Sequence, residues 1–300
     1  MRVVITGASG FIGKPLSKML AELGFEVLAV TRKRPDGESI NLLSWLEADL
    51  SSPETYQKAI KLFSPEVLIH LAWQDIPDYS LDKSILNLNQ SLEFISFITE
   101  IKSCKKILIS GSCWEYDKTQ GECNENYIGK PKDYFTLSKH SLRLWLNMIT
   151  KDKSISLGWF RLFYVYGPGQ KSHSLIPSVL NHLKDGSLPD IKTLHNSSDY
   201  IFIDDVVDAF AIAVKSSFES GIYNLGTGKS TSVLEVCRIA ERIVLNSSIL
   251  TKNIEKKSSS SISDVNFWAG VSSSQKHLKW SSKIDLSDGI NHTWNYFKSK

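Results

Sequence analysis

The sequence has few of the features that mark membrane, secreted or metal-binding proteins. No apolar run approaches the roughly 20 residues that a membrane-spanning helix needs. We expect no leader peptide, because a strand-like run already begins at Arg2. The four cysteines, which lack the close spacing of metal ligands, are Cys104, Cys113, Cys123 and Cys237. We therefore expect a cytoplasmic protein with reduced thiols, no metal site and no membrane partner.

A large excess of one charge is also missing. The 35 basic and 32 acidic residues leave a net charge of +3. This excess is too small to attract a polyanion, so we expect no nucleic-acid partner. The 300 residues, 42% of them hydrophobic, can bury one large core or one core with a smaller satellite domain.

The most informative feature that is present lies at the N-terminus. A short apolar run is followed by Gly7, Gly10 and Gly13 and then by a helical pattern of apolar residues. In such a turn the first glycine permits the tight bend, the second lets the backbone approach a pyrophosphate, and the third lets the helix pack on the sheet. The helix N-terminus adds free N–H groups and a positive dipole end. The pattern predicts a dinucleotide site, with an ordinary strand-to-helix turn as the alternative.

The first half of the chain alternates between strand and helix patterns. We expect strands at 3–6, 26–31, 67–70, 106–110 and 155–160, and helices near 11–23, 53–63, 84–101 and 135–150. Such alternation is typical of an α/β fold, a doubly wound parallel sheet of the Rossmann type with helices on both faces.

The pattern loosens after residue 168. We expect a helix at 175–185, a strand at 199–203, a helix at 204–216, a strand at 222–225 and a helix at 232–245, followed by a polar stretch from 247 to 263. We expect residues 1–168 to form the dinucleotide-binding domain, with 196–221 returning to it. Residues 169–195 and 222–300 would form a smaller substrate-binding lobe over the C-terminal edge of the sheet.

Further motifs occur in a fixed order along most of the chain. They are His70-Leu71-Ala72-Trp73, Asn87, Gly167-Pro168-Gly169-Gln170 and Tyr223-Asn224-Leu225-Gly226-Thr227-Gly228. Together with the Gly-x-x-Gly-x-x-Gly turn, this order resembles the extended short-chain dehydrogenase/reductase family, the NAD(P)-dependent nucleotide-sugar epimerases, dehydratases and ketoreductases. The resemblance implies a nicotinamide cofactor held by Gly7, Ser9, Gly10, Phe11, Ile12, Gly13, Thr31, Arg32, Asp49, Leu50, Leu71, Ala72, Trp73, Asn87 and Lys139.

The family's catalytic residues are a Ser or Thr and a Tyr-x-x-x-Lys pair, in which the Tyr exchanges the proton and the Lys lowers the pKa of the Tyr and holds the ribose. The resemblance assigns these roles to Ser112, to position 135 and to Lys139. Position 135 is Phe135, which has no proton to give. The adjacent Tyr134 lies about 140° from Lys139 around a regular helix, so it cannot simply replace the missing phenol.

Three explanations of Phe135 remain open. The chain is an engineered Tyr-to-Phe variant; or the natural enzyme uses Tyr134 through a shifted helix start, Glu115, or a water held by Ser112; or the protein binds NADP without chemistry. The family's Lys, often lost in sensor proteins, is retained here, which counts against the last explanation. If only the proton donor is missing, the chain should bind NADP(H) normally, and Phe135→Tyr should raise its rate by roughly 10²–10⁴-fold.

The end of the second strand bears on the choice of cofactor. NAD-specific members of the family end this strand with an acidic residue that accepts from the ribose 2′-hydroxyl. Here Thr31 is followed by three cations and no acid, and a guanidinium such as that of Arg32 can grip a 2′-phosphate. We expect NADP, with NAD and a merely solvated basic loop as the alternatives.

The substrate side shows two departures from the family's pattern. Dehydratases carry Asp-Glu where this chain has Cys113 and Trp114, so we expect no elimination of water. Tyr164 replaces the Asn that commonly binds the substrate phosphate. The resemblance implies a substrate site that includes Ser112, Trp114, Tyr164, Ser174 and Ile176.

These observations predict an NADP-dependent reductase of a nucleotide-linked 4-keto-deoxy sugar, of the kind that supplies surface polysaccharide. The alternatives are a nucleotide-sugar epimerase and a catalytically silent NADP-binding protein. The predicted helix at 84–101 carries more apolar surface than one sheet-facing stripe needs. The resemblance therefore implies a homodimer through a four-helix interface, with a helix buried inside one subunit as the alternative.

Overall fold

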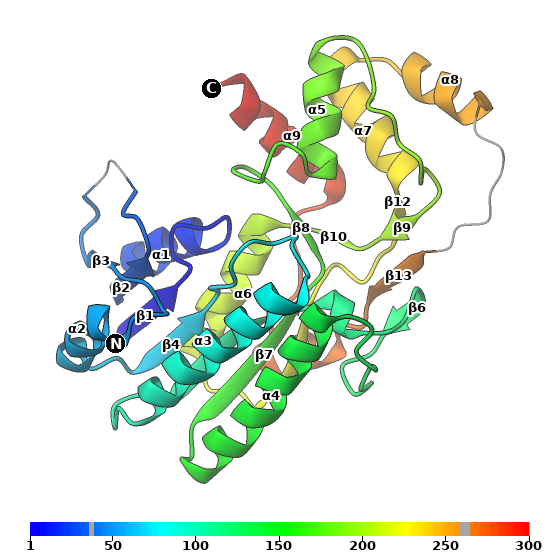
Figure 1. Ribbon diagram of the computed structural model, residues 1–300. Coiled ribbons are helices and arrows are strands. Elements are labelled where there is room, and N and C mark those ends of the chain that lie inside the picture. The colour runs from blue at the N-terminus through cyan, green and yellow to red at the C-terminus, as the bar shows by residue number, and fades with distance from the viewer. Residues whose placement is uncertain (36–38, 258–264, 300) are drawn as a thin grey trace.

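The computed structural model describes residues 1–35, 39–257 and 265–299, and it is built around a seven-stranded sheet (Figure 1). In spatial order the strands are β11 (Gly221–Leu225), β7 (Ser156–Leu162), β5 (Lys106–Ser112), β4 (Val67–His70), β1 (Arg2–Thr6), β2 (Glu26–Thr31) and β3 (Leu43–Glu47). All neighbouring pairs are parallel. The strand order reverses between β1 and β4, and ligands of such sheets bind at the carboxyl ends of the strands beside this point.

Helices cover both faces of the sheet, as a doubly wound fold requires. One face carries α1 (Gly13–Glu22) and α6 (Ile203–Lys215), which contact each other. The other face carries α3 (Leu81–Thr99) and α4 (Tyr134–Asp152), which pack side by side (Figure 1), and the short α2 (Gln57–Phe63). The predicted α/β Rossmann-type fold is confirmed.

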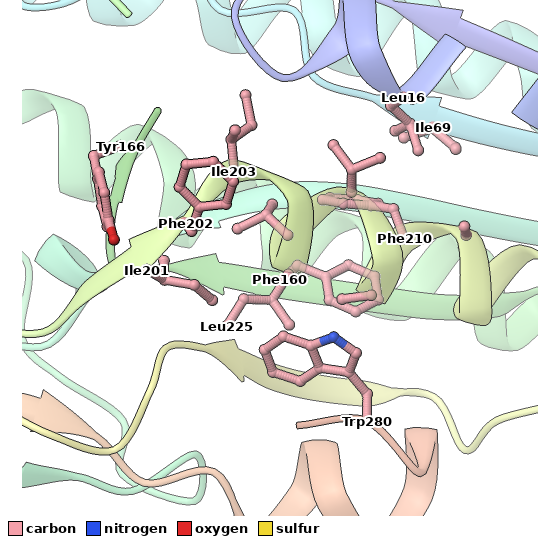
Figure 2. Close-up of a cluster of buried hydrophobic side chains, with 14 of the residues drawn as sticks. Leu16, Ile69, Phe160, Tyr166, Ile201, Phe202, Ile203, Phe210, Leu225 and Trp280 are labelled. Atoms are coloured by element: carbon pink, nitrogen blue, oxygen red, sulfur yellow. The ribbon is translucent and has the colours of Figure 1, made fainter. Parts of the chain in front are cut away.

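The buried side chains form two cores because successive residues of a strand point to opposite faces. Val3 and Ile5 of β1 face the core under α1 and α6, whereas Val4 faces the core under α3 and α4. Figure 2 shows part of the first core, where Phe160 of β7 and Phe210 of α6 pack at 4.8 Å between ring centroids. Both faces of the sheet are therefore buried, and its functional groups gather at the strand ends.

A smaller lobe lies over the carboxyl ends of the strands. Its sheet runs β12 (Thr231–Ser232), β9 (Ser197–Ser198), β13 (Asn266–Ala269) and β6 (Gln120–Cys123), and β8 (Tyr164–Tyr166) pairs separately with β10 (Tyr200–Phe202). Its helices are α5 (Leu175–Lys184), α7 (Val233–Leu245), α8 (Ile249–Lys257) and α9 (Leu286–Lys298). Figure 1 shows α5, α7 and α9 grouped together at this end of the molecule.

The lobe boundaries differ from the predicted division. The boundary at residue 222 cuts through β11, which belongs to the main sheet because its backbone pairs with β7 over its whole length. Conversely, β6 lies within the predicted domain 1–168 yet pairs with β13 of the small sheet. Of the returning segment 196–221, β9 and β10 belong to the smaller sheets, and α6 packs on the large one.

The predicted secondary structure agrees with the observed one more closely in the first half of the chain than in the second. The strands and helices predicted for the first half are present with small shifts at their ends. The elements that were not predicted are β3, β6, β8, β9, β12, β13, α8 and α9. The predicted polar stretch 247–263 contains α8, and its last residues, 258–263, lie outside the described residues. Within the described ranges, no helix combines the length and the apolar character that crossing a membrane requires.

Candidate active site

The glycine turn has the shape of a phosphate cradle. Gly7 has a φ of +67°, and a Cβ at this position would lie 2.8 Å from the backbone nitrogen of Ala72. A Cβ on Gly13 would collide with the carbonyl of Gly7, so only glycine lets α1 approach the turn this closely. Helix α1 begins without a side-chain cap and without an acidic residue in its first turn. Its N–H groups and dipole therefore suit an anionic ligand.

A groove of about 340 Å³ opens beside this turn, at the point where the strand order reverses. Ten of the predicted cofactor residues line it: Gly7, Ser9, Gly10, Thr31, Arg32, Leu50, Leu71, Ala72, Trp73 and Asn87. The other predicted residues lie outside this lining. Phe11 lines a neighbouring cavity, and Asp49 accepts two hydrogen bonds from Ser51. Ile12 and Gly13 lie at the start of α1, and Lys139 lies in α4.

The rim of the groove is cationic. The Thr31 hydroxyl lies 2.7 Å from that of Ser9 at the end of β2, and the next two residues, Arg32 and Lys33, line the groove as exposed cations. None of the described residues that line the groove is acidic. The groove therefore fits a phosphate-bearing dinucleotide, and its rim suits a ligand with an additional phosphate.

Gln74 is a groove residue that the sequence analysis missed. Its side-chain oxygen accepts a hydrogen bond from Arg32 at 3.0 Å, and its side-chain nitrogen donates to Gln90 at 2.7 Å. Its backbone nitrogen donates to Asn87 at 2.6 Å. The only signal in the sequence is its place directly after the motif that ends at Trp73. A hydrogen-bonded chain thus links the cationic rim to α3.

Ser112 ends β5 and begins a 3₁₀ turn (Cys113–Glu115). Its hydroxyl oxygen accepts a hydrogen bond from the backbone nitrogen of Trp114 at 3.2 Å. Because a hydroxyl can accept and donate at once, this capping role leaves the Ser112 proton for another oxygen. The capping interpretation and the predicted catalytic role are therefore compatible.

Glu115 is an anchor in the structure rather than a free acid. Its side chain is fully buried and pairs with Arg161 at 3.2 Å. It also accepts from the indole nitrogen of Trp159 at 3.0 Å and from the backbone nitrogen of Ser112 at 2.8 Å. A buried carboxylate with this many donors is held firmly in place, and it fixes the position of Ser112.

Helix α4 has the regular register that places positions 135 and 139 on one face. It begins at Tyr134 because the Asp133 side chain caps it, accepting from the backbone nitrogen of Thr136 at 2.7 Å. Phe135 is 6% exposed and Lys139 is 3% exposed, whereas Tyr134 is 51% exposed. The structure does not show the shifted helix start that would turn Tyr134 toward Lys139.

The Lys139 amine lies in an enclosed aromatic setting. It donates to the carbonyl oxygen of Ser110 at 2.9 Å and lies 3.8 Å from the centre of the Trp73 ring. Burial lowers the pKa of Lys139 to about 7, against a smaller opposing effect of Glu115. The Phe135 ring packs edge-on against Trp73 at 5.7 Å and against Tyr79 at 4.9 Å. Tyr79 is a site residue that the sequence analysis did not name.

A second cavity, of about 550 Å³, lies between the end of β5 and the small lobe. Of the predicted substrate residues, Trp114 and Tyr164 line it, together with Cys113, Asp133 and Leu175. Ser112 is not among the residues that line this cavity or the cofactor groove, and Ile176 lies outside the cavity as well. Ile176 is 2% exposed in the main core, and Leu175 faces the cavity instead, because neighbouring residues of α5 point about 100° apart. Ser174 stands at the N-cap of α5 outside this lining.

The Cys113 thiol is unsuited to acid–base chemistry. Burial, reinforced by Cys123 and Asp199, raises the pKa of Cys113 far above that of a free thiol. The thiol therefore stays neutral at physiological pH and has a structural place in the core. No cluster of three metal-ligating side chains occurs among the residues that the structure describes.

Comparison with known families settles the class of protein. The sequence model of the NAD dependent epimerase/dehydratase family matches residues 3–226, about three quarters of the chain. The chain belongs to this family. The predicted resemblance to the extended short-chain dehydrogenases/reductases is thereby confirmed, and so is the prediction of an enzyme family that acts on nucleotide sugars.

Members of this family align with nearly the whole chain. The CDP-abequose synthase of Salmonella muenchen is 24% identical over 298 residues, covering 96% of this chain and 95% of the relative. The dTDP-4-dehydro-6-deoxyglucose reductase of Escherichia coli is 27% identical over 310 residues, with the same shares covered. The structure of the UDP-glucose 4-epimerase of Thermotoga maritima with UDP-glucose superposes with a TM-score of 0.84 at 22% identity, covering 100% of this chain and 99% of that one. At this identity the superposition establishes the fold alone.

Proposed function

We propose that the protein is an NADP-dependent reductase that transfers a hydride to the keto carbon of a nucleotide-linked 4-keto-deoxy sugar, for the synthesis of surface polysaccharide sugars. The observation that carries the proposal is the position of the buried Lys139 amine, which lies 3.8 Å from the centre of the Trp73 ring of the cofactor groove and donates to the carbonyl of Ser110, two residues before Ser112. Two full-length relatives support it, since one is named as a 4-dehydro-6-deoxyglucose reductase and the other as an abequose synthase.

The missing phenol does not by itself decide the direction of the reaction. Oxidation of a sugar hydroxyl, the opening step of an epimerase that works through a keto intermediate, needs a base that removes the hydroxyl proton, and reduction of a ketone needs a donor that returns it. In the family's pattern the Tyr beside the Lys serves in both directions, and Phe135 can serve in neither. The preference for a reductase over an epimerase therefore rests on the two full-length relatives, whose names describe a reductase and a synthase.

The cofactor half of the site is assigned from the groove. The glycine turn and the N-terminus of α1 would hold the pyrophosphate, Arg32 and Lys33 the 2′-phosphate, and Lys139 the ribose next to the nicotinamide. When bound, the cofactor supplies the hydride. A neighbouring structure at 23% identity with a TM-score of 0.80, MoeE5, contains NAD and UDP-glucuronic acid. The preference of this chain for NADP rests instead on its own acid-free rim.

The substrate half is assigned to the 550 Å³ cavity. Ser112 would donate its hydroxyl proton in a hydrogen bond to the keto oxygen and hold it in place. Lys118 and Lys132 line the cavity and are the cations available there for a diphosphate. Trp114, which is 58% exposed, would cover an apolar face of the sugar.

The test is a turnover assay with NADPH and a panel of 4-keto-6-deoxy sugars linked to CDP, dTDP, GDP and UDP. We expect one of them to consume NADPH in a stoichiometric amount, and Ser112→Ala to lose most of this rate. Interconversion of two hydroxyl epimers without net consumption of NADPH would identify an epimerase. Tight NADPH binding with no change in any sugar would identify a silent binding protein.

We also propose that the enzyme is a homodimer. Helices α3 and α4 pack together, and the outer surface that they form is apolar. The residues with exposed fractions between 38% and 66% on these helices are Leu81, Ile85, Leu86, Tyr134, Leu137, Leu144, Trp145 and Met148. A contiguous apolar surface of this kind, repeated on a second copy, supports an isologous interface.

A further inference from the structure

The loop between β4 and α3 brings a second phenol to the site. This loop (cyan in Figure 1) carries Trp73 near its start and Tyr79 near its end, and the rings of both residues contact Phe135. The Tyr79 and Phe135 ring centroids are 4.9 Å apart with the planes tilted by 43°. Tyr79 therefore lies against the ring that stands where the family has its proton-transferring Tyr.

The loop is tied by three contacts to two parts of the protein, α3 and the segment that carries Lys171. Asp75 forms an ion pair with Lys83 at the start of α3, and the backbone oxygen of Ile76 accepts from Lys171 at 2.7 Å. Gln74, at the other end of the segment, is bound to Asn87 at 2.6 Å. These contacts hold the loop before any ligand arrives, so the Tyr79 ring is positioned in advance.

The groups around Tyr79 lie beside the substrate side of the site. Tyr79 is not itself among the residues that line the 550 Å³ cavity, but the charge of Asp133, which does line it, acts on the Tyr79 hydroxyl. Burial, followed by Asp133 and Cys113, raises the pKa of Tyr79. The phenol is therefore protonated at neutral pH and can serve as an acid. With 42% of its surface exposed, it can recover a proton from water.

We propose that Tyr79 donates the proton that completes the reduction, in place of the phenol that Phe135 lacks. This role rests on the proposed reductase function. As the keto carbon accepts the hydride, the C=O π pair moves onto the oxygen. The Tyr79 O–H bond breaks, its proton forms the new hydroxyl of the sugar, and water then protonates the phenolate. The chain is on this account a competent reductase, not the slow enzyme that the sequence predicts.

Other donors fit the structure less well. Tyr134 is 51% exposed on the outer side of α4. The buried Glu115 carboxylate is already bound by Arg161, Trp159 and the Ser112 backbone. Tyr79 is the tyrosine whose ring contacts Phe135 among the described residues.

The test compares the kcat of variants that lose or gain a single phenolic hydroxyl group. Tyr79→Phe keeps the ring against Phe135, so a purely structural role would leave kcat unchanged. We expect kcat to fall by roughly 10²–10⁴-fold, with the Kd for NADPH unaltered. Adding Phe135→Tyr to Tyr79→Phe should restore most of the rate, because it returns a phenol next to Lys139. Phe135→Tyr alone should change kcat by less than about tenfold, a small effect compared with that of a missing general acid. Tyr134→Phe is the matched control.

A binding measurement tests the same role without turnover. The loss of one hydrogen bond to the keto oxygen should weaken the binding of the keto-sugar nucleotide to Tyr79→Phe by roughly 2- to 10-fold. Unchanged kcat and unchanged binding in Tyr79→Phe would overturn the proposal, as would a 10²–10⁴-fold gain from Phe135→Tyr alone. If neither the wild type nor Phe135→Tyr reduces any keto sugar, the reductase function fails and the role of Tyr79 fails with it. An active wild type with an equally active Tyr79→Phe would instead overturn the role of Tyr79 alone.

Discussion

At the scale of single residues, the phenylalanine at position 135 leaves Lys139 without a phenol as its partner. In the family's pattern a phenol at this position would share its proton with the catalytic lysine. Here Lys139 donates to the Ser110 carbonyl and lies over the Trp73 ring. Its amine is thus kept as a binding group, and proton transfer falls to a residue on another element.

The first prediction at this scale concerns Arg32. Its guanidinium lies on the acid-free rim and donates to Gln74, from where it can turn to a 2′-phosphate. We expect NADPH to bind more tightly than NADH, and Arg32→Ala to erase most of that difference, as titration by fluorescence or calorimetry would show. Arg34 is an exposed cation outside the groove lining, so Arg34→Ala should leave the difference between the NADPH and NADH affinities unchanged. Equal affinities in the unmodified protein would contradict the assignment.

The second prediction concerns the pH dependence of stability. Burial lowers the pKa of Lys139 from 10.5 to about 7. Between these values the unfolded chain keeps a proton on Lys139 that the folded chain has lost, so this group makes stability rise with pH. Lys139→Met should be more stable than the wild type near neutral pH. The difference in the free energy of unfolding between Lys139→Met and the wild type should shrink by roughly 1 kcal/mol per pH unit between about pH 7.5 and about pH 9.5.

Urea unfolding of both proteins across that range measures this gap. Lys58→Met, which replaces an exposed lysine on α2, should differ from the wild type by a constant amount at every pH. A constant gap for Lys139→Met as well would mean that the Lys139 amine titrates normally in the folded protein.

At the scale of secondary-structure elements, α4 and the loop between β4 and α3 position the groups of the proposed catalytic site. Helix α4 fixes the face that carries Phe135 and Lys139, because its cap at Asp133 sets where the helix begins. The loop between β4 and α3 sets what packs on that face, since it carries both Trp73 and Tyr79. The helix could be predicted from its own sequence. In the loop the motif that ends at Trp73 could be recognised, but nothing in the sequence indicated that Tyr79 reaches Phe135.

The register of α4 gives the third prediction. Tyr134 points to the outside of the helix and is 51% exposed, so Tyr134→Phe, which removes only an exposed hydroxyl, should leave kcat and KM within about twofold of the wild type. Steady-state assays with the keto-sugar nucleotide that the turnover panel selects are sufficient. Loss of activity in Tyr134→Phe, with Tyr79→Phe still active, would mean that α4 begins elsewhere in solution and that Tyr134 is the proton donor.

The order of the strands controls the position of the site at the scale of the whole molecule. The reversal between β1 and β4 places the glycine turn and the loop that follows β4 side by side, although they are far apart in the sequence. The small lobe then closes the substrate side, with β6 from the first half of the chain joining β13 from the second.

The fourth prediction concerns assembly. The apolar outer surface of α3 and α4 predicts a dimer mass by light scattering at micromolar concentration. Trp145→Glu, which puts a charge on a residue that is 55% exposed in the middle of this surface, should give a monomer. Leu62→Glu, at a 77% exposed residue of α2, should leave the dimer intact. A monomer mass for the unmodified protein would reject the interface.

The sequence by itself determined the features that depend on local spacing. The glycine turn, the first strands and helices and the shared face of positions 135 and 139 follow from residues within one or two turns of each other, where backbone geometry leaves few alternatives. The order of the motifs likewise determined the family. The cationic rim, on which the proposed preference for NADP rests, was readable for the same reason, because it directly follows a strand.

Only the tertiary structure decided which distant residues meet. Tyr79 reaches Phe135, and Gln74 reaches Arg32, across loops without periodicity, so no spacing could indicate these contacts. Leu175 rather than Ile176 faces the substrate cavity because the packing of α5 sets its rotation. Short strands such as β6 have too few residues to show alternation, and pairing with a partner strand alone defines them. Local sequence thus specified the turn and the helix face, whereas long-range packing selected the side chains that complete the site.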